Sequence, residues 1–157
     1  MARVLIVGCG CRGQALARAL SAGGHAVRGT TRDPARLELI EAAGVEAVTA
    51  DPDRLATLMG PIEGTSVVCW LMGTAAAADA DPLHGPRLES MLEHIVDTPV
   101  RGLVYETGGV DRPAGIAAAR RAAATYAMPV EILEADPGRH DEWTAAALAA
   151  VTSVLAA

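Results

Sequence analysis

The most useful absence in this sequence is lysine, because all thirteen basic residues among the 157 are arginines. Mechanisms that need a lysine base or a lysine Schiff base are therefore excluded. Phenylalanine is also absent and aromatic residues make up 3% of the chain, so Val, Leu, Ile and Ala must build the core. The formal net charge of −6 argues against a nucleic-acid interface, which requires a basic face.

Long apolar runs and metal-ligand patterns are lacking as well. No stretch reaches the ~18 uninterrupted apolar residues of a membrane span. The apolar run after Arg3 is about five residues long, shorter than the roughly 7–15 residues of a signal peptide. Cys9, Cys11 and Cys69 are odd in number and lack metal-ligand spacing, so no metal site is expected. Free thiols suit a reducing compartment, which favours a cytoplasmic location.

What the chain does contain is a regular alternation of strand and helix patterns, read as one domain over residues 1–157. Hydrophobic residues make up 51% of the chain, as in globular proteins. The alternation predicts an α/β fold with a doubly wound parallel six-stranded Rossmann sheet of order 3-2-1-4-5-6 in three α/β/α layers. The expected strands are 3–7, 25–31, 45–50, 65–72, 100–106 and 130–134; the expected helices are 13–22, 33–43, 51–59, 86–96, 113–126 and 139–155; residues 73–85 are expected to be a mobile loop.

A glycine-rich run, Gly8-Cys9-Gly10-Cys11-Arg12-Gly13, joins the first expected strand to the first expected helix. This is the context that a dinucleotide-binding fingerprint requires. Gly8 permits a tight turn, Gly10 lets the backbone approach a pyrophosphate, and Gly13 lets the helix pack close to the strand. The free N–H groups at the start of the helix would face the phosphates. The whole run is therefore expected to bind the cofactor, including Cys9, Cys11 and Arg12.

The end of the second expected strand predicts the type of cofactor. Arg32 stands about 20 residues past the glycines, where a carboxylate would bind the ribose 2′-hydroxyl of NAD. A guanidinium there can bind a 2′-phosphate through two parallel N–H donors. Thr31 adds a hydroxyl donor and Arg36 adds charge, so NADP is the predicted cofactor and NAD the other candidate. Asp33 is expected to cap a helix, because Pro34 follows it.

The third and fourth expected strands supply further cofactor contacts. Asp51 either accepts a hydrogen bond from the adenine amino group or caps the helix that begins near Pro52, and the sequence favours neither. Leu71, Met72 and Gly73 end the fourth strand, where they are expected to line the nicotinamide ribose.

Candidate catalytic residues follow from the fifth expected strand. Tyr105 and Thr107 lie near its end, where a substrate would approach the cofactor. His84 lies in the expected mobile loop, and a single histidine in a loop is usually solvated, so it is not expected to donate a proton.

Three segments carry a family resemblance: the glycine-rich run, residues 24–34 and residues 44–51. They resemble atypical short-chain dehydrogenase/reductases of the extended, epimerase-like kind, in particular the YeeZ-like group, with NmrA-like proteins as noncatalytic relatives. The resemblance implies a Rossmann fold and NAD(P) binding. It assigns the glycine-rich run to the pyrophosphate, Thr31 and Arg32 to the adenosine ribose, and Asp51 to the adenine.

The departures from this family bear on catalysis. Active members use a Tyr followed four residues later by Lys, whereas here Tyr105 is followed by Gly109 and Tyr126 by Val130. The serine expected after the fifth strand appears as Thr107. The glycine pattern is G-x-G-x-x-G rather than the G-x-x-G-x-x-G of many extended members. Most of the C-terminal substrate-binding part of extended members is also expected to be missing.

Three functions stay open at this point. The first is a noncatalytic or weakly catalytic NADP(H)-binding protein, such as a redox or cofactor sensor. The second is an NADP-dependent oxidoreductase or epimerase that uses Thr107, Tyr105 or His84 on a small-molecule substrate of unknown identity. The third is an interaction module that binds another nucleotide. The last expected helix is apolar around most of its circumference, which favours a homodimer through its outer face.

Overall fold

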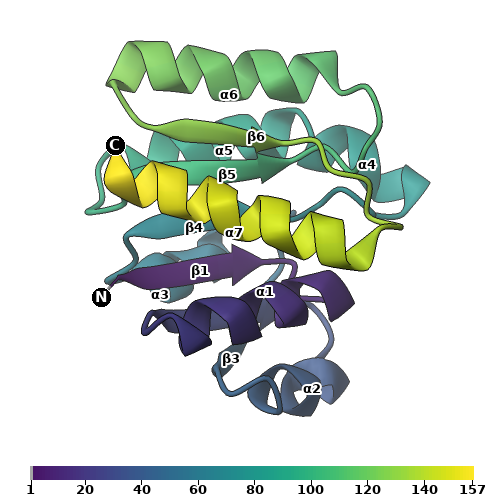
Figure 1. Cartoon of the computed structure of the whole chain (residues 1–157). Coiled ribbons are helices and arrows are strands. Elements are labelled where there is room, and N and C mark those ends of the chain that lie inside the picture. Colours follow the sequence, from purple (N-terminus) through teal and green to yellow (C-terminus); the bar gives the residue numbers. More distant parts are fainter. Residues whose placement is uncertain (1) are drawn as a thin grey trace.

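The computed structural model describes residues 2–157, which form six strands separated by helical segments (Figure 1). The elements in chain order are β1 (Arg3–Val7), α1 (Cys11–Ala22), β2 (Ala26–Thr31), a 3₁₀ turn (Pro34–Arg36), α2 (Leu37–Glu41), β3 (Glu46–Thr49), a 3₁₀ turn (Leu55–Leu58), α3 (Met59–Ile62), β4 (Val67–Trp70), α4 (Ala77–Leu83), α5 (Pro86–Ile95), β5 (Gly102–Glu106), α6 (Pro113–Tyr126), β6 (Val130–Leu133) and α7 (His140–Ala156).

All neighbouring strands are parallel and follow the order β3-β2-β1-β4-β5-β6, so the predicted Rossmann topology is confirmed. The chain reverses its direction of travel across the sheet between β1 and β4. Open α/β sheets bind ligands at this switch point, beyond the carboxyl ends of the strands. The glycine-rich run follows β1 and therefore lies at that position.

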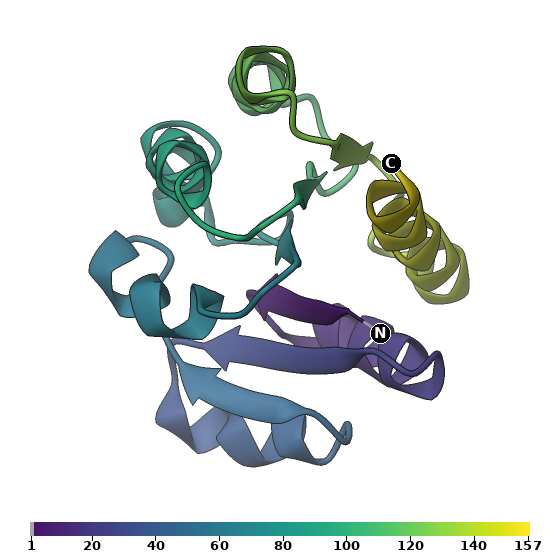
Figure 2. The same cartoon turned by 90° about the vertical axis from the view of Figure 1, so that its left-hand side faces the viewer.

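Helices cover both faces of the twisted sheet, as Figure 2 shows. One core lies between the sheet and α1, α2 and α7, and the other lies between the sheet and α3 to α6. The central strand β1 serves both cores. Val4 and Ile6 pack into the first, whereas Leu5 and Val7 pack into the second. A strand buried on both faces must be apolar throughout, which explains the unbroken apolar run that predicts it.

The expected mobile loop 73–85 contains a helix, α4, so this expectation was wrong. The segment is rich in alanine, which has the highest helix propensity. Pro82 lies inside the helix and removes one i→i−4 hydrogen bond, and the helix ends one residue later, at Leu83. The second and third expected helices are shorter than predicted, because each begins as a 3₁₀ turn. Asp33 caps the first of these turns as predicted, since its carboxylate accepts a hydrogen bond from the Ala35 N–H.

The last helix, α7, buries one face against the sheet through Trp143, Ala147, Val151 and Val154. Its outer face carries exposed Ala145 and Ala149, and the homodimer through this face stays a prediction. Within residues 2–157 there is no helix with the length and apolarity to cross a bilayer. The cytoplasmic location also stays a prediction.

Replacing Gly29 on β2 tests how closely the core between the sheet and α1, α2 and α7 is packed around the glycine-rich run. A Cβ atom at this position would lie 2.7 Å from Cys9 Sγ and 3.0 Å from Ile40 Cγ2. We expect Gly29→Ala to lower the free energy of unfolding by about 1–3 kcal/mol through overpacking. The matched control is Gly60→Ala, where an added Cβ meets no atom within 4 Å. Urea unfolding measures both, and equal stability of the two variants would contradict this packing.

Candidate functional site

The turn after β1 is shaped by glycine and held by β2. Gly8 has a φ of +83°, and a Cβ atom there would overlap Met72 Cε and lie 2.7 Å from the Leu71 carbonyl oxygen. The Gly8 N–H donates to the Thr30 hydroxyl (3.2 Å), and the Cys9 N–H donates to the Thr30 carbonyl (2.8 Å). The turn therefore has one conformation, and any substitution of Gly8 would strain it.

Helix α1 presents an uncompensated N-terminus to the space above this turn. Its N-cap is Gly10, and within the described residues the helix has no side-chain cap and no acidic residue in its first turn. A Cβ atom at Gly10 would meet no atom within 4 Å, so the space next to it is open. The N–H groups at the helix start and the helix dipole together suit a diphosphate, as the glycine pattern predicts.

The cysteines of the turn pack rather than react. Cys9 is buried, its sulfur lies against Gly13 and Gly29, and burial raises the pKa of its thiol to about 12. Cys69 on β4 is also buried, and burial, together with the neighbouring Cys9, raises its pKa to about 12. Cys11 is exposed. Thiols kept protonated by burial are poor nucleophiles and poor metal ligands.

A cleft of about 440 Å³ opens above the turn. It contains seven of the predicted cofactor residues: Gly8, Cys9, Gly10, Thr31, Arg32, Leu71 and Met72. The remaining walls come from Gln14, Thr30, Asp33, Arg36, Ala50, Pro52, Thr74, Ala75, Ala76 and Leu83. The other predicted residues, Cys11, Arg12, Gly13, Asp51 and Gly73, do not line it.

Two arginines flank the cleft at the end of β2. Arg32 forms an ion pair with Asp79 of α4 (3.6 Å), and Arg36 forms one with Asp33 (3.9 Å). All four side chains are between 43% and 66% exposed. Such exposed pairs contribute about 0–1 kcal/mol. Either guanidinium can therefore exchange its carboxylate for a more highly charged anion at little cost.

Asp51 does not cap a helix as predicted, because the helical segment after it begins at Leu55 and has Arg54 as its N-cap residue. Its carboxylate accepts a hydrogen bond from the Asp53 N–H (2.9 Å), and its backbone N–H donates to the Thr57 hydroxyl (2.8 Å). These bonds hold an Asx turn ahead of the Leu55–Leu58 segment. Contact with an adenine stays a prediction.

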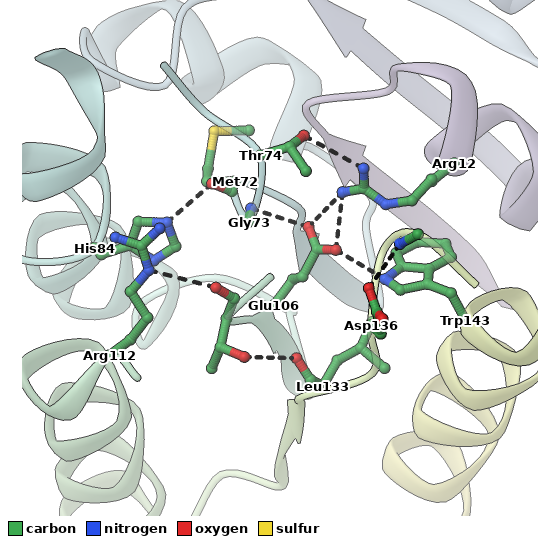
Figure 3. A network of polar contacts seen from close by, with 12 residues as sticks. Arg12, Met72, Gly73, Thr74, His84, Glu106, Arg112, Leu133, Asp136 and Trp143 are labelled. Atoms are coloured by element: carbon green, nitrogen blue, oxygen red, sulfur yellow. Dashed lines mark hydrogen bonds and ion pairs between the residues drawn. The ribbon is translucent and has the colours of Figure 1, made fainter. Parts of the chain in front are cut away.

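The strongest polar contact of the site was missed by the sequence analysis. Glu106 at the end of β5 is fully buried, and three residues donate hydrogen bonds to its carboxylate (Figure 3). Arg12 Nη2 donates to both oxygens (3.0 and 2.9 Å), the Gly73 N–H to Oε1 (3.0 Å), and Trp143 Nε1 to Oε2 (2.8 Å). Arg12 also lies over the Trp143 ring, 5.0 Å from its centroid. The available signals were an acid ending an apolar strand and an arginine inside the glycine-rich run.

This network explains why Arg12 and Gly73 do not line the cleft. Removing one partner of a buried ion pair costs about 3–5 kcal/mol, so the Arg12 side chain is held towards β5. The Arg12 Nε atom is buried without a hydrogen-bond partner among residues 2–157, and stacking on Trp143 offsets part of that cost.

His84 is buried rather than solvated, so that expectation was wrong. Its side chain is tied on both sides: Nε2 lies 2.9 Å from the Met72 carbonyl, and Nδ1 lies 2.6 Å from the Tyr105 hydroxyl. Because a carbonyl can only accept, Nε2 carries the proton and Nδ1 accepts from Tyr105. Burial lowers the pKa of His84 from 6.5, against an opposing effect of the Met72 carbonyl. Burial raises the pKa of Tyr105 to about 12.

The two candidate catalytic hydroxyls both point away from the cleft. Tyr105 is fully buried and its hydroxyl lies under Gly115 of α6. Thr107 is 1% exposed, and its hydroxyl donates to the Leu133 carbonyl of β6 (3.4 Å). Neither residue lines the cleft. Their catalytic role stays a prediction that this geometry does not favour.

Comparison with known proteins identifies the family. A family model for NAD(P)H binding matches residues 9–152, which include the glycine-rich run from Cys9 onwards and the strands β2 to β6. The chain belongs to this NAD(P)H-binding family. Its open diphosphate cradle and arginine pair fit the adenosine and phosphate groups of such a cofactor. No curated protein matches the chain.

Solved structures with the same fold include reductases and an epimerase. Vestitone reductase from alfalfa aligns with a TM-score of 0.62 at 15% identity over 84% of this chain and 56% of its own. The Citrobacter sp. triphenylmethane reductase complexed with NADP(H) aligns with a TM-score of 0.64 at 17% identity, over 83% of this chain and 48% of its own. UDP-N-acetylglucosamine 4-epimerase from Bacillus cereus aligns with a TM-score of 0.65 at 10% identity, over 84% of this chain and 53% of its own.

These likenesses confirm the Rossmann fold that the predicted family resemblance implies, and the family match confirms the NAD(P)-binding domain. The chain spans about half the length of these three structures, at 56%, 48% and 53%.

Replacing Glu106 tests the buried network. We expect Glu106→Leu to lower the free energy of unfolding by about 3–5 kcal/mol, because it leaves the Arg12 guanidinium without its carboxylate. The double variant Arg12→Met/Glu106→Leu should recover much of this loss, since it removes both charges. As a control, Glu89→Ala breaks the exposed pair with Arg121 and should cost less than about 1 kcal/mol. Urea unfolding would contradict the network if Glu106→Leu cost no more than Glu89→Ala.

The buried His84 predicts a pH dependence of stability. Its pKa is lower in the folded than in the unfolded chain, so the unfolded chain binds more protons as the pH falls. We therefore expect the free energy of unfolding to decrease as the pH is lowered through the unfolded pKa of about 6.5. His84→Gln should flatten this decrease, whereas His140→Gln, at an exposed position, should not. The measurement is the free energy of unfolding at several pH values between 7 and 5. If it falls equally steeply with pH in the unmodified chain, His84→Gln and His140→Gln, this role of His84 is refuted.

Proposed function

We propose that this chain is an NADP(H)-binding protein that carries out no proton-coupled hydride transfer with its own side chains, and that it acts as a cofactor sensor. The supporting observation is the cleft, whose lining includes Gly10 at the bare N-terminus of α1 and two exchangeable arginines, Arg32 and Arg36. When bound, the nicotinamide group of such a cofactor can accept or supply a hydride.

The diphosphate would be held by the turn after β1. Gly10 leaves the space open, and the first N–H groups of α1 supply hydrogen-bond donors. Met72 and Leu71 provide an apolar wall beside it.

The 2′-phosphate of NADP would be held by Arg32 and Arg36. Both line the cleft, and each is paired with an exposed carboxylate. A phosphate carries more charge than a carboxylate and accepts two parallel N–H bonds from a guanidinium. Asp79 would then turn to solvent, where it is already half exposed, while Asp33 would keep its hydrogen bond from the Ala35 N–H.

The proposal that the chain is noncatalytic is supported by the hydrogen bonds that the polar groups near β5 already make within the protein. The Tyr105 hydroxyl donates to His84, and the Thr107 hydroxyl donates to Leu133. A tyrosine with its pKa raised to about 12 is a poor acid–base catalyst at neutral pH. No lysine is present anywhere in the chain to lower that pKa.

Cofactor preference tests this proposal. In a thermal-shift assay we expect NADP and NADPH to stabilise the chain more than NAD and NADH do. A ligand at 100 times its own Kd raises the free energy of unfolding by about 2.7 kcal/mol over that of the free chain. Arg32→Ala should remove this preference and leave the affinity for NAD nearly unchanged. Arg18→Ala removes the same charge from an exposed position outside the cleft and should leave the preference intact. If Arg32→Ala retains the full preference, the assignment of the 2′-phosphate site is wrong.

A further inference from the structure

The cleft stops short of the end of β5. Its walls come from the segments that follow β1, β2, β3 and β4, together with α1 and α4. Among the described residues that line it, none belongs to β5 or to the segment that follows it. A ligand held by the turn after β1 can therefore extend into the cleft towards Arg32. The cleft offers it no space towards the end of β5.

The space at the end of β5 is filled by the protein itself. The Glu106 carboxylate accepts hydrogen bonds from Arg12, Gly73 and Trp143, all at 3.0 Å or less (Figure 3). Next to it, the backbones of Gly73 and Gly108 are in contact, so closely that a Cβ atom on Gly108 would overlap the Gly73 carbonyl. The three side chains of Arg12, Glu106 and Trp143 and the two loops at Gly73 and Gly108 together close this end of the switch point.

This closure resists opening by a ligand. Separating Arg12 from Glu106 would leave a fully buried carboxylate without its cation. The Gly73 N–H and the Trp143 indole would lose their acceptor at the same time. The nicotinamide ring has no N–H on its ring nitrogen, either as the pyridinium of NADP or as the neutral dihydropyridine of NADPH, so this nitrogen cannot replace the N–H donors of the guanidinium.

The groups that do face the cleft match the adenosine phosphate and diphosphate part of the cofactor. Arg32 and Arg36 suit a phosphate on the adenosine ribose, and the N-terminus of α1 suits the diphosphate. Thr31 and Gln14 also line the cleft and add polar side chains to it.

We propose that this cleft recognises the adenosine 2′-phosphate 5′-diphosphate part of its ligand and leaves the nicotinamide riboside outside, so that oxidised, reduced and nicotinamide-free ligands bind alike. The inference rests on the proposed function and narrows it. The chain then responds to the total amount of NADP and NADPH and not to their ratio.

Isothermal titration calorimetry with NADP, NADPH and 2′-phospho-ADP-ribose tests this inference on the whole chain. We expect the three Kd values to agree within about fivefold. Bound NADPH should keep a nicotinamide fluorescence that acrylamide quenches as readily as in free NADPH. Arg32→Ala should weaken all three ligands by the same factor, because each would use the same 2′-phosphate contact.

The outcomes separate this inference from the proposed function. A Kd for NADP or NADPH that is lower by more than about fivefold than that of 2′-phospho-ADP-ribose overturns the inference but leaves NADP(H) binding standing. Protection of the bound nicotinamide from acrylamide, or an unequal effect of Arg32→Ala on the three ligands, does the same. Failure of all three ligands to bind overturns both.

Discussion

The carboxylate of Glu106 joins the parts of the molecule that meet at the switch point. It ends β5, and its hydrogen bonds reach α1 through Arg12, the segment after β4 through Gly73, and α7 through Trp143. A buried charge is tolerated where its partners satisfy it fully, and here three donors surround one carboxylate. The network fixes the start of α1 relative to β5, and with it the turn that faces the cleft.

The cleft and the network divide the carboxyl edge of the sheet between two tasks. On the side of β2 and β3 the edge is open, lined by exchangeable arginines and a bare helix N-terminus. On the side of β5 it is closed by an ion pair that the chain supplies. Tyr105 and His84 belong to the closed side, because their hydrogen bond is buried beneath α4 and α6. This division is what separates binding from chemistry in our account.

The sequence predicted those features that local patterns encode. The apolar run of β1, the glycine-rich turn and the order of the strands follow from burial on both faces, backbone freedom and right-handed crossovers. It could not predict contacts between distant residues, such as Arg12 with Glu106, which are 94 positions apart. For the same reason His84 looked like a solvated loop residue, although α4 carries it into the core against Tyr105. Composition alone did not reveal whether residues 73–85 form a loop or a helix.

An amide NMR titration with NADP tests most directly whether the diphosphate cradle and the closed end of the switch point are separate. The account predicts that the backbone N–H resonances of Gly10 and Gln14 move as ligand is added, because these residues line the cleft at the start of α1. It also predicts that the indole N–H resonance of Trp143 stays in place, because its acceptor Glu106 keeps its partners. A titration in which the Trp143 indole shifts while the amides at the start of α1 do not would contradict it.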